Sequence, residues 1–312
     1  MSFQFAVLGS GSRGNSALFA HQGDGLLIDV GLGPRALADR LESVGSCWSR
    51  IRAVVLTHTH GDHVDAGALR GMTKRGVHLY CHEGHRENLE ANAGFAALDR
   101  AGLVRHYDER PFMGPNGFRI EPIPAWHDGG PTFGFRIEAG AGRKRRGAAL
   151  GYLADTGTWC DAMAEALADV DVLGIEFNHD VAMQRHSGRS PRLIARNLGD
   201  RGHLSNQQGA ELVASILERS RRDRVGHLVL LHLSQQCNTP ALALQAAGDV
   251  TRENDRQVLI HAARQAPAHP NLRFGPSRST FPWRTNGLRR PKPAKRPVEP
   301  LAFLPGFNLE SA

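Results

Sequence analysis

Hydrophobic and polar positions along the chain follow two periodicities. Alternating or short apolar runs predict strands at 3–9, 16–21, 25–31, 51–57, 77–82, 118–125, 132–139, 148–155, 171–177, 227–234 and 257–263. Helical spacing predicts helices at 33–45, 64–76, 84–101, 161–169, 190–197, 206–221 and 240–251. At two places in the chain, three predicted strands follow one another without a helix between them. A strict alternation of strands and helices would not give this pattern. The pattern therefore predicts an α/β protein with two sheets and helices on the outside.

A glycine-rich loop follows the first predicted strand. Residues 9–14 match the GxGxxG pattern of dinucleotide-binding loops. The sequence after it alternates with a period of two, which indicates a hairpin and not the helix that such a loop requires. Ser10, Ser12 and Asn15 remain candidates for hydrogen bonds to a substrate, and capping of the turn is the alternative.

Composition indicates the compartment. The chain has 312 residues, of which 41% are hydrophobic, enough for one large domain or two ordinary ones. Its four cysteines stand far apart without a CxxC pair, which is typical of a reducing compartment. The first residues lack the features of a signal peptide, and no apolar run approaches the ~18 residues of a membrane span. We therefore expect a cytoplasmic protein with no membrane partner.

The positive charge gathers at the end of the chain. The formal net charge is +7, and residues 264–312 hold nine Lys/Arg against two Asp/Glu, so the preceding residues balance to zero. Nine of the 17 prolines also fall there, and proline interrupts helices and sheet interiors. The composition predicts a folded domain at 1–265 and a basic, largely disordered tail at 266–312. This tail either contacts nucleic acid or only keeps the protein in solution.

The densest polar cluster directly follows a predicted buried strand. It contains His58, His60, Asp62 and His63. His58 and His60 are two apart in an extended segment, so their side chains point the same way. Gly61 lets the chain turn, which aims Asp62 and His63 from a second direction. Nitrogen and oxygen ligands without a thiolate suit Zn, and also Mn or Fe, so the spacing favours a site for two divalent metal ions.

Three further ligand-type residues stand where apolar strands end. They are His127, Asp155 and His232. Loops at strand ends are where α/β and sandwich folds present chemistry. Each residue alone has an ordinary structural explanation, as a turn cap or a strand-end histidine. Together they complete two coordination spheres.

These residues, in this order, resemble the motif set of the metallo-β-lactamase superfamily. The similarity covers nearly all of residues 1–263 and implies an αββα sandwich of two mixed sheets, with the metals at one edge. Further segments are similar to the YycJ/WalJ group of this superfamily, described as metal-dependent DNA exonucleases of the cytoplasm: LGSGSRGNS, LLIDVG, EFNHD, GHLSN and HLSQQCNTP. Two features depart from the group pattern, because Cys237 replaces the usual Asn and the basic tail has no counterpart.

The resemblance also implies a role for each residue. One ion would be held by His58, His60 and His127, and the other by Asp62, His63 and His232, with Asp155 bridging them. Asp29 would orient a metal-binding histidine.

The implied chemistry is attack on phosphorus by a hydroxide shared between the two ions. Asp62, His179 and His203 are the catalytic candidates, the histidines as proton donors or phosphate contacts. Structural hydrogen bonds are the alternative for both histidines. Glu176 is a weaker candidate that supports the ligands from behind.

The function predicted is a metal-dependent phosphodiesterase that acts on DNA as an exonuclease. A hydrolase of a small substrate, such as a cyclic phosphodiester, thioester or lactone, would use the same metal site. The metal ligands alone therefore do not distinguish between these two functions. A non-catalytic nucleic-acid binder is a second alternative, which the intact ligand set argues against. The following arginines are candidates for a groove that binds DNA, or else a solvated helix face: Arg13, Arg185, Arg189, Arg192 and Arg196. The oligomeric state stays open.

Overall fold

The computed structural model describes residues 3–140 and 147–275. Contacts divide the chain into two units, 1–281 and 282–312, and the second lies outside the described residues. The described part contains two sheets of seven strands each. The strands of the first sheet, in spatial order, are β14 (Asn271–Phe274), β1 (Phe3–Gly9), β2 (Ser16–His21), β3 (Asp24–Ile28), β4 (Ile51–Val55), β5 (His78–His82) and β6 (Val104–Tyr107). Those of the second are β13 (Leu259–Ala262), β12 (His227–Leu231), β11 (Val172–Glu176), β10 (Ala148–Leu153), β9 (Thr132–Ala139), β8 (Arg119–Ala125) and β7 (Phe112–Met113).

Both sheets are mixed, as predicted. Strands β1 to β3 form antiparallel hairpins, and β4, β5 and β6 continue the sheet in parallel. In the second sheet β8, β9 and β10 are antiparallel, while β10 to β13 are parallel. The two runs of three successive strands that the pattern predicted are therefore the antiparallel parts of the two sheets.

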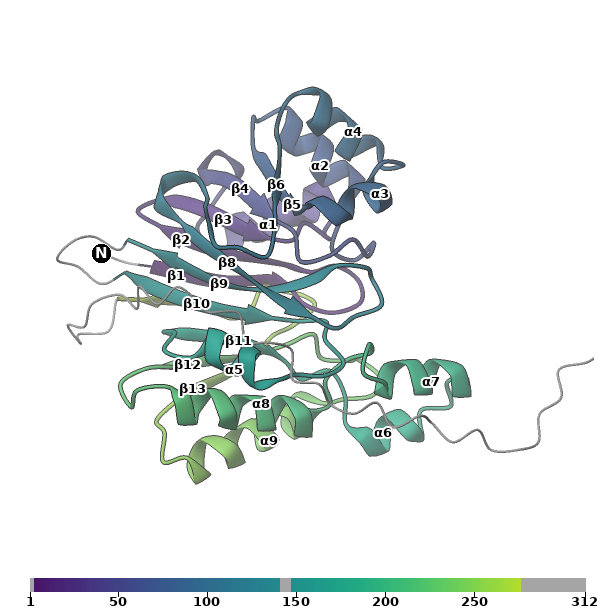
Figure 1. The fold of residues 1–312 in the computed structure, drawn as a ribbon, viewed down its shortest axis with the longest axis vertical. Coiled ribbons are helices and arrows are strands. Elements are labelled where there is room, and N and C mark those ends of the chain that lie inside the picture. The colour runs from purple at the N-terminus through teal and green to yellow at the C-terminus, as the bar shows by residue number, and fades with distance from the viewer. Residues whose placement is uncertain (1–2, 141–146, 276–312) are drawn as a thin grey trace, which may run out of the picture. The chain divides into compact units, whose positions relative to one another are not determined.

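Helices cover the outer faces of the sheets (Figure 1). The first sheet carries α1 (Pro34–Ser43), α2 (Ala66–Thr73), α3 (Arg86–Leu89) and α4 (Ala93–Arg100). The second sheet carries α5 (Asp161–Leu167), α8 (Asn206–Arg219) and α9 (Pro240–Glu253). The short helices α6 (Val181–Arg185) and α7 (Pro191–Leu198) follow β11, and three 3₁₀ turns, η1 (Trp48–Arg50), η2 (Glu83–His85) and η3 (Pro115–Gly117), complete the described elements.

Three hydrophobic cores hold these layers together. The inner faces of the two sheets meet in a core that includes Phe5, Phe19 and Phe135, all fully buried. The outer faces pack against the helices in two further cores. Burial of this apolar surface is the main stabilising contribution, and it fixes the two sheets face to face. The αββα sandwich expected from the resemblance is thus confirmed.

Two segments differ from the expected elements. The helix predicted at 84–101 is divided into η2, α3 and α4, because the Asn92 side chain accepts the N–H groups of Gly94 and Phe95 and starts a new helix. Residues 266–275, assigned to the tail, lie in the described body and contribute β14, which pairs with β1. An edge strand tolerates nearby prolines that a central strand would not. The remaining tail residues, 276–312, lie outside the described residues.

Candidate metal centre

The centre lies where strands of both sheets end. β10, β11 and β12 run parallel, so their carboxyl ends meet at one edge, where Asp155, Glu176 and His232 stand. The loop between β4 and α2 carries the residues of segment 58–63, and the loop after β8 carries His127. The structure brings all seven ligand candidates from the sequence to this edge, in groups whose ligand atoms lie close together.

Three imidazoles form the first group. His60 Nδ1 lies 3.2 Å from His58 Nε2 and 3.2 Å from His127 Nε2. His58 and His127 are buried, whereas 34% of the His60 side chain is exposed. The ligand atoms of the three rings lie within 4.8 Å of one another, which is close enough for one ion.

Hydrogen bonds behind these rings determine which nitrogen is free. The Thr57 hydroxyl donates to Asp29 Oδ2 at 2.8 Å, so it accepts from His58 Nδ1, 2.9 Å away. His127 Nδ1 donates to the Gly202 carbonyl at 2.9 Å. Because a neutral imidazole carries one N–H, the Nε2 atoms of His58 and His127 present lone pairs to the centre.

A carboxylate connects this group to a second one. Asp155 Oδ2 lies 3.1 Å from His63 Nε2, and Asp155 Oδ1 lies 2.9 Å from His232 Nδ1. Asp62 Oδ2 lies 3.7 Å from His63 Nε2 and 4.0 Å from His232 Nε2. His58, His63 and Asp155 also gather within reach of a single ion. Asp155 therefore lies between the two groups, where a bridging ligand would have to be.

Glu176 and His203 extend the second group. His203 Nδ1 lies 2.8 Å from Glu176 Oε1 and 3.4 Å from Asp155 Oδ1, and His232 Nδ1 lies 3.0 Å from Glu176 Oε1. The His203 side chain is 13% exposed, so solvent reaches it. Burial lowers the pKa of His203, but the charge of Glu176 and the hydrogen bonds to Asp155 and Glu176 together outweigh burial and raise this pKa to about 9. The sequence assigned Glu176 a supporting role, and the structure gives it contacts to two histidines of the centre.

Buried charges control the protonation of the second group. Burial opposes the ionised form of Asp155, but the charges of His232 and His63 hold its pKa well below the usual range. Burial likewise lowers the pKa of His63, yet the carboxylates of Asp29 and Asp155 outweigh it and raise this pKa to about 10. The buried carboxylates thus require positive charge nearby, either as protons on the histidines or as cations.

The donor set fits divalent cations. Asp155 Oδ2 is buried and has no hydrogen bond of acceptable geometry among the described residues. A carboxylate oxygen without a hydrogen bond in a protein interior is costly unless a cation, such as protonated His63 or a metal ion, lies beside it. Imidazole lone pairs converge beside it, and no thiolate takes part. The residues present therefore fit divalent metal ions with nitrogen and oxygen ligands.

Asp29 holds the metal-binding loop from behind. It accepts the Thr57 N–H at 2.8 Å and the His63 Nδ1–H at 2.8 Å, which directs His63 Nε2 toward the centre, where Asn15 Nδ2 and Asp155 Oδ2 lie 2.9 and 3.1 Å away. These contacts are those that its predicted role as an orienting residue requires. Asp29, Asp155 and His232 all have left-handed backbone, with φ of 62°, 57° and 54°. Such strain is uncommon outside glycine and gathers at functional sites.

The glycine-rich loop near the N-terminus also supports the centre. Asn15 Nδ2 donates to Asp62 Oδ2 at 3.0 Å, and Ser10 Oγ accepts the His232 N–H at 2.7 Å. We predicted Ser10 and Asn15 as substrate contacts, but both are buried and hold ligand residues instead. The sequence does not reveal this, because it depends on loops that are distant along the chain. Ser12 is exposed and stays a predicted substrate contact.

Two other predicted residues have no contact with the ligands. His179 is buried, and neither ring nitrogen has a hydrogen-bond partner in the described ranges. Burial lowers its pKa to about 4, so the ring is neutral near pH 7. Arg185 is exposed at the end of α6. Their catalytic and substrate-binding roles stay predictions.

Sequence reasoning missed Asp128, which follows a ligand candidate directly. Its Oδ1 atom lies 3.5 Å from His127 Nε2 and 3.6 Å from His60 Nε2. Arg196 of α7 forms a bidentate pair with this carboxylate, and its hydrogen bonds hold the pKa of Asp128 low. Adjacency to His127 was the only available signal, and the contact with α7 appears only in the fold.

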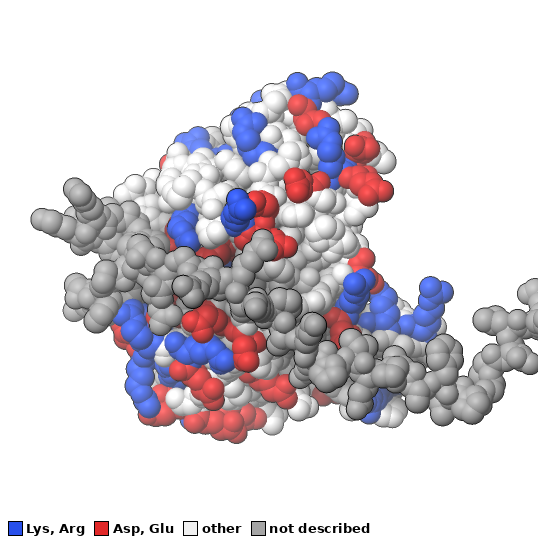
Figure 2. Space-filling view, in the orientation of Figure 1, with Lys and Arg blue, Asp and Glu red and all other residues white. Residues whose placement is uncertain are grey.

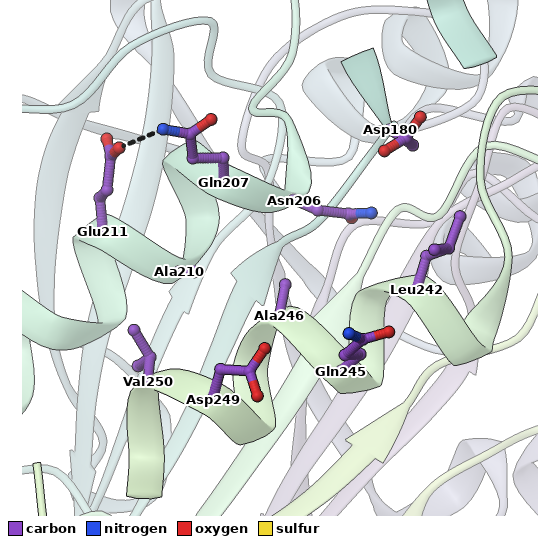
Figure 3. Close-up of a pocket in the computed structure, with 10 residues that line it drawn as sticks. All are labelled: Asp180, Asn206, Gln207, Ala210, Glu211, Leu242, Gln245, Ala246, Asp249 and Val250. Carbon is purple, nitrogen blue, oxygen red and sulfur yellow. Dashed lines mark hydrogen bonds between the residues drawn. The ribbon is translucent and has the colours of Figure 1, made fainter. Parts of the chain in front are cut away.

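A cavity of about 440 Å³ lies apart from this centre, between α8 and α9 (Figure 3). Its lining residues are Asp180, Asn206, Gln207, Ala210, Glu211, Leu242, Gln245, Ala246, Asp249 and Val250. None of them is a ligand candidate. Within 3–140 and 147–275, no helix has both the length and the apolar composition of a membrane span.

Two facing sheets between helices, with histidines and carboxylates gathered at one edge, define a class of metal-binding sandwich proteins. A family model described as "Beta-lactamase superfamily domain" matches residues 25–233. The chain belongs to this superfamily.

Individual relatives narrow the comparison. The chain is similar to "Exodeoxyribonuclease WalJ" of Streptococcus pneumoniae serotype 2, with 30% identity over 245 residues, 78% of this chain and 86% of the relative. It is similar to "Exodeoxyribonuclease YycJ" of Bacillus anthracis, with 28% identity over 255 residues, 81% of this chain and 90% of the relative. Among solved structures, the metallo-beta-lactamase fold protein YhfI from Bacillus subtilis aligns with a TM-score of 0.61 at 17% identity, covering 86% of this chain and 99% of that one, which shows the shared fold.

Proposed function

We propose that this protein is a metal-dependent phosphodiesterase that degrades DNA as an exonuclease. The observation that carries the proposal is the complete set of ligand-type residues gathered at one edge of the sandwich. Two relatives that the chain matches over most of its length are named exodeoxyribonucleases. The residues of the centre thus indicate the type of reaction, and the names of the relatives indicate DNA as the substrate.

The residues divide into two ligand sets. One ion would be held by His58, His60 and His127, and the other by Asp62, His63 and His232, with Asp155 shared. When bound, the two ions lower the pKa of water toward neutrality and neutralise charge on the phosphoryl oxygens. We expect Zn or Mn, with Fe as a further possibility, because the donors are nitrogen and oxygen only.

His203 is placed to protonate the leaving oxygen. Glu176 accepts the Nδ1–H of His203 and so orients the ring. The Nε2 atom of His203 has no hydrogen-bond partner in the described ranges, so a substrate oxygen can contact it. In the hydrolysis, water loses one proton to the solvent and its oxygen bonds to phosphorus, the bond from phosphorus to the 3′ or 5′ oxygen breaks, and His203 Nε2 gives its proton to that oxygen.

The free cysteines suit a reducing cytoplasm, where we expect the protein to act. Cys47, Cys81, Cys160 and Cys237 are all unpaired. The basic residues of 266–312 would add affinity for nucleic acid.

The test uses end-labelled linear DNA and closed circular DNA, each incubated with metal-loaded protein. An exonuclease degrades the linear DNA and leaves the circle intact, because it needs an end. Asp62→Asn removes a ligand charge with little change of shape, and we expect at least a ~100-fold loss of the rate, as is typical for lost transition-state stabilisation.

Asp161→Asn is the matched control, because this aspartate is 85% exposed and pairs only with Arg219 among the described residues. It should retain the wild-type rate. Absence of DNA degradation by the wild type, or activity that survives in Asp62→Asn, would refute the proposed function.

A further inference from the structure

Two arginines from distant parts of the chain contact one dipeptide beside the metal centre. Arg13 Nη2 donates to Gln235 Oε1 at 3.2 Å. Arg189 donates to Gln236 Oε1 from Nη2 at 2.8 Å and from Nε at 3.2 Å. The dipeptide begins three residues after the ligand candidate His232. The fold thereby brings the N-terminal loop and the α6–α7 segment to the same turn.

The turn that carries this dipeptide is held firmly. Its Cys237 N–H donates to Ser234 Oγ at 3.1 Å, and its Cys237 carbonyl accepts the Asp180 N–H at 2.8 Å. The Ser234 N–H in turn donates to the Asn178 carbonyl at 2.8 Å. Both glutamine side chains are nevertheless exposed. The backbone of this turn is therefore fixed, and its two glutamine side chains hold the guanidinium groups at the surface.

The partners of these arginines are neutral, which leaves the positive charge available. Arg189 also contacts Gln184 Oε1 at 3.4 Å, a second neutral acceptor. Within the described ranges, no carboxylate lies at ion-pair distance from Arg13 or Arg189. Arg196, by contrast, is paired with Asp128. A guanidinium group held by amide oxygens retains its full charge and its remaining N–H groups for an anion.

More positive charge continues along the same segment. Arg185 and Arg192 are exposed on α6 and α7, also without an ion-pair partner in the part of the chain described. Figure 2 shows Lys and Arg side chains gathered over α7. A group of unpaired cations near the candidate metal centre is complementary to a chain of phosphates.

We propose that Arg13 and Arg189 form a phosphate clamp that holds the backbone of a single DNA strand beside the metal centre. This inference rests on the proposed function, since it names the residues that bind the strand. The two acceptors belong to neighbouring residues, whose Cα atoms are ~3.8 Å apart, so both cations can reach phosphates of one strand. Contacts to phosphates are independent of base sequence, so the clamp would accept any sequence.

The test measures binding and hydrolysis separately in the variant Arg13→Gln/Arg189→Gln. Binding of a fluorescent single-stranded oligonucleotide is followed by anisotropy at several salt concentrations. We expect the affinity to fall at least about tenfold, because charge-assisted hydrogen bonds are lost. The slope of log affinity against log salt should decrease by about 1.4, since each phosphate contact contributes about 0.7 for single strands.

Three comparison variants make the result specific. Gln235→Glu/Gln236→Glu keeps both arginines but pairs them with carboxylates, and it should weaken binding as well. Arg13→Lys/Arg189→Lys keeps the charge and should restore most of the salt slope. Arg222→Gln is the matched control, because this arginine is 76% exposed. Arg222 precedes the first residue of β12, whereas His232 follows the last residue of the same strand.

Hydrolysis of the oligonucleotide is compared with that of the p-nitrophenyl ester of thymidine 5′-phosphate, a small phosphodiester. A clamp on the strand predicts a KM increase about tenfold larger for the oligonucleotide than for the ester. Equal effects on both substrates, or an unchanged salt slope, would overturn the clamp. If the wild type binds DNA through these arginines but hydrolyses neither substrate, the clamp stands and the proposed function fails.

Discussion

At the scale of single residues, buried side chains behind the candidate ligands hold those ligands in place. Asp29 accepts hydrogen bonds from Thr57 and His63, and Asn15 donates to Asp62. Each of these contacts fixes the direction of a ligand atom before any ion arrives. Ordering the ligands in advance reduces the entropy that metal binding would otherwise lose.

Asn15 gives the sharpest prediction at this scale. Its Oδ1 atom accepts the Gly11 N–H at 2.8 Å, which turns Nδ2 toward Asp62 Oδ2. We expect Asn15→Ala to weaken the binding of the more weakly held ion by 10- to 100-fold, as is typical when such a partner is lost. Competition with a metallochromic chelator measures this affinity. Asn206→Ala, which removes a buried asparagine that pairs with Asn238, is the control for a general loss of packing. Equal metal affinities in wild type and Asn15→Ala would contradict the assignment.

At the scale of elements, the ends of the strands and the turns after them determine which side chains lie at the metal centre. His232 directly follows β12, and Asp155 follows β10 after one intervening residue. The left-handed backbone of both residues turns the chain sharply at the sheet edge. The periodicity of β10 and β12 predicts where those strands end, so these residues could be found from the sequence. The hydrogen bonds that fix the turns come from other strands and loops, so their geometry could not.

One 3₁₀ turn connects the two sheets through a histidine. His85 of η2 is fully buried; its Nδ1 accepts the His82 N–H at 3.2 Å, and its Nε2–H donates to the Pro131 carbonyl, just before β9, at 2.8 Å. Both nitrogens are thus satisfied only in the neutral ring. Burial lowers the pKa of His85 to about 4.

The lowered pKa predicts a loss of stability in acid. The folded pKa lies below the unfolded value of about 6.5, so the unfolded chain binds the proton first as the pH falls. The contribution of neutral His85 to the free energy of unfolding is fully present above pH ~6.5. It is lost as the pH falls through the folded pKa, with a total on the order of 3 kcal/mol. In His85→Gln this part of the pH dependence should disappear. Urea unfolding between pH 4 and 7 measures the difference, and parallel curves for wild type and variant would contradict it.

At the scale of the whole described body, the candidate ligands come from both sheets. His58 and His63 follow β4 of the first sheet, whereas Asp155 and His232 follow β10 and β12 of the second. An ion held between them would connect the layers in addition to the hydrophobic core. Binding to the folded state alone stabilises it by about 4 kcal/mol at a thousandfold excess over Kd.

Metal addition should therefore raise the thermal stability of chelator-stripped protein. A gain of about 4 kcal/mol corresponds to a rise in Tm on the order of 10 °C for a body of this size. Differential scanning fluorimetry with Zn or Mn measures the rise, and Asp155→Asn should show a much smaller one. Calcium, which prefers sites with more oxygen ligands, is the control ion. A Tm that does not respond to Zn or Mn would contradict metal binding at this centre.

The sequence by itself determined the layers and the identity of the ligand candidates. Alternating and helical periodicities are local properties, so β1, β2, β3 and α8 follow from the chain directly. The ligand candidates stand at the ends of such strands, which made them visible without the fold. The edge strand β14 was not predicted, because its four residues lie among prolines and are stabilised by pairing with β1.

Only the tertiary structure decided how these residues cooperate. In the fold, Asn15 donates a hydrogen bond to Asp62, and Ser10 accepts one from the His232 N–H. Arg13 and Arg189 both donate to the dipeptide at 235–236. Arg13 and Gln235 are 222 positions apart along the chain, as are Ser10 and His232. No local pattern carries information about such pairs, because they form only when the packing of the two sheets brings distant loops together.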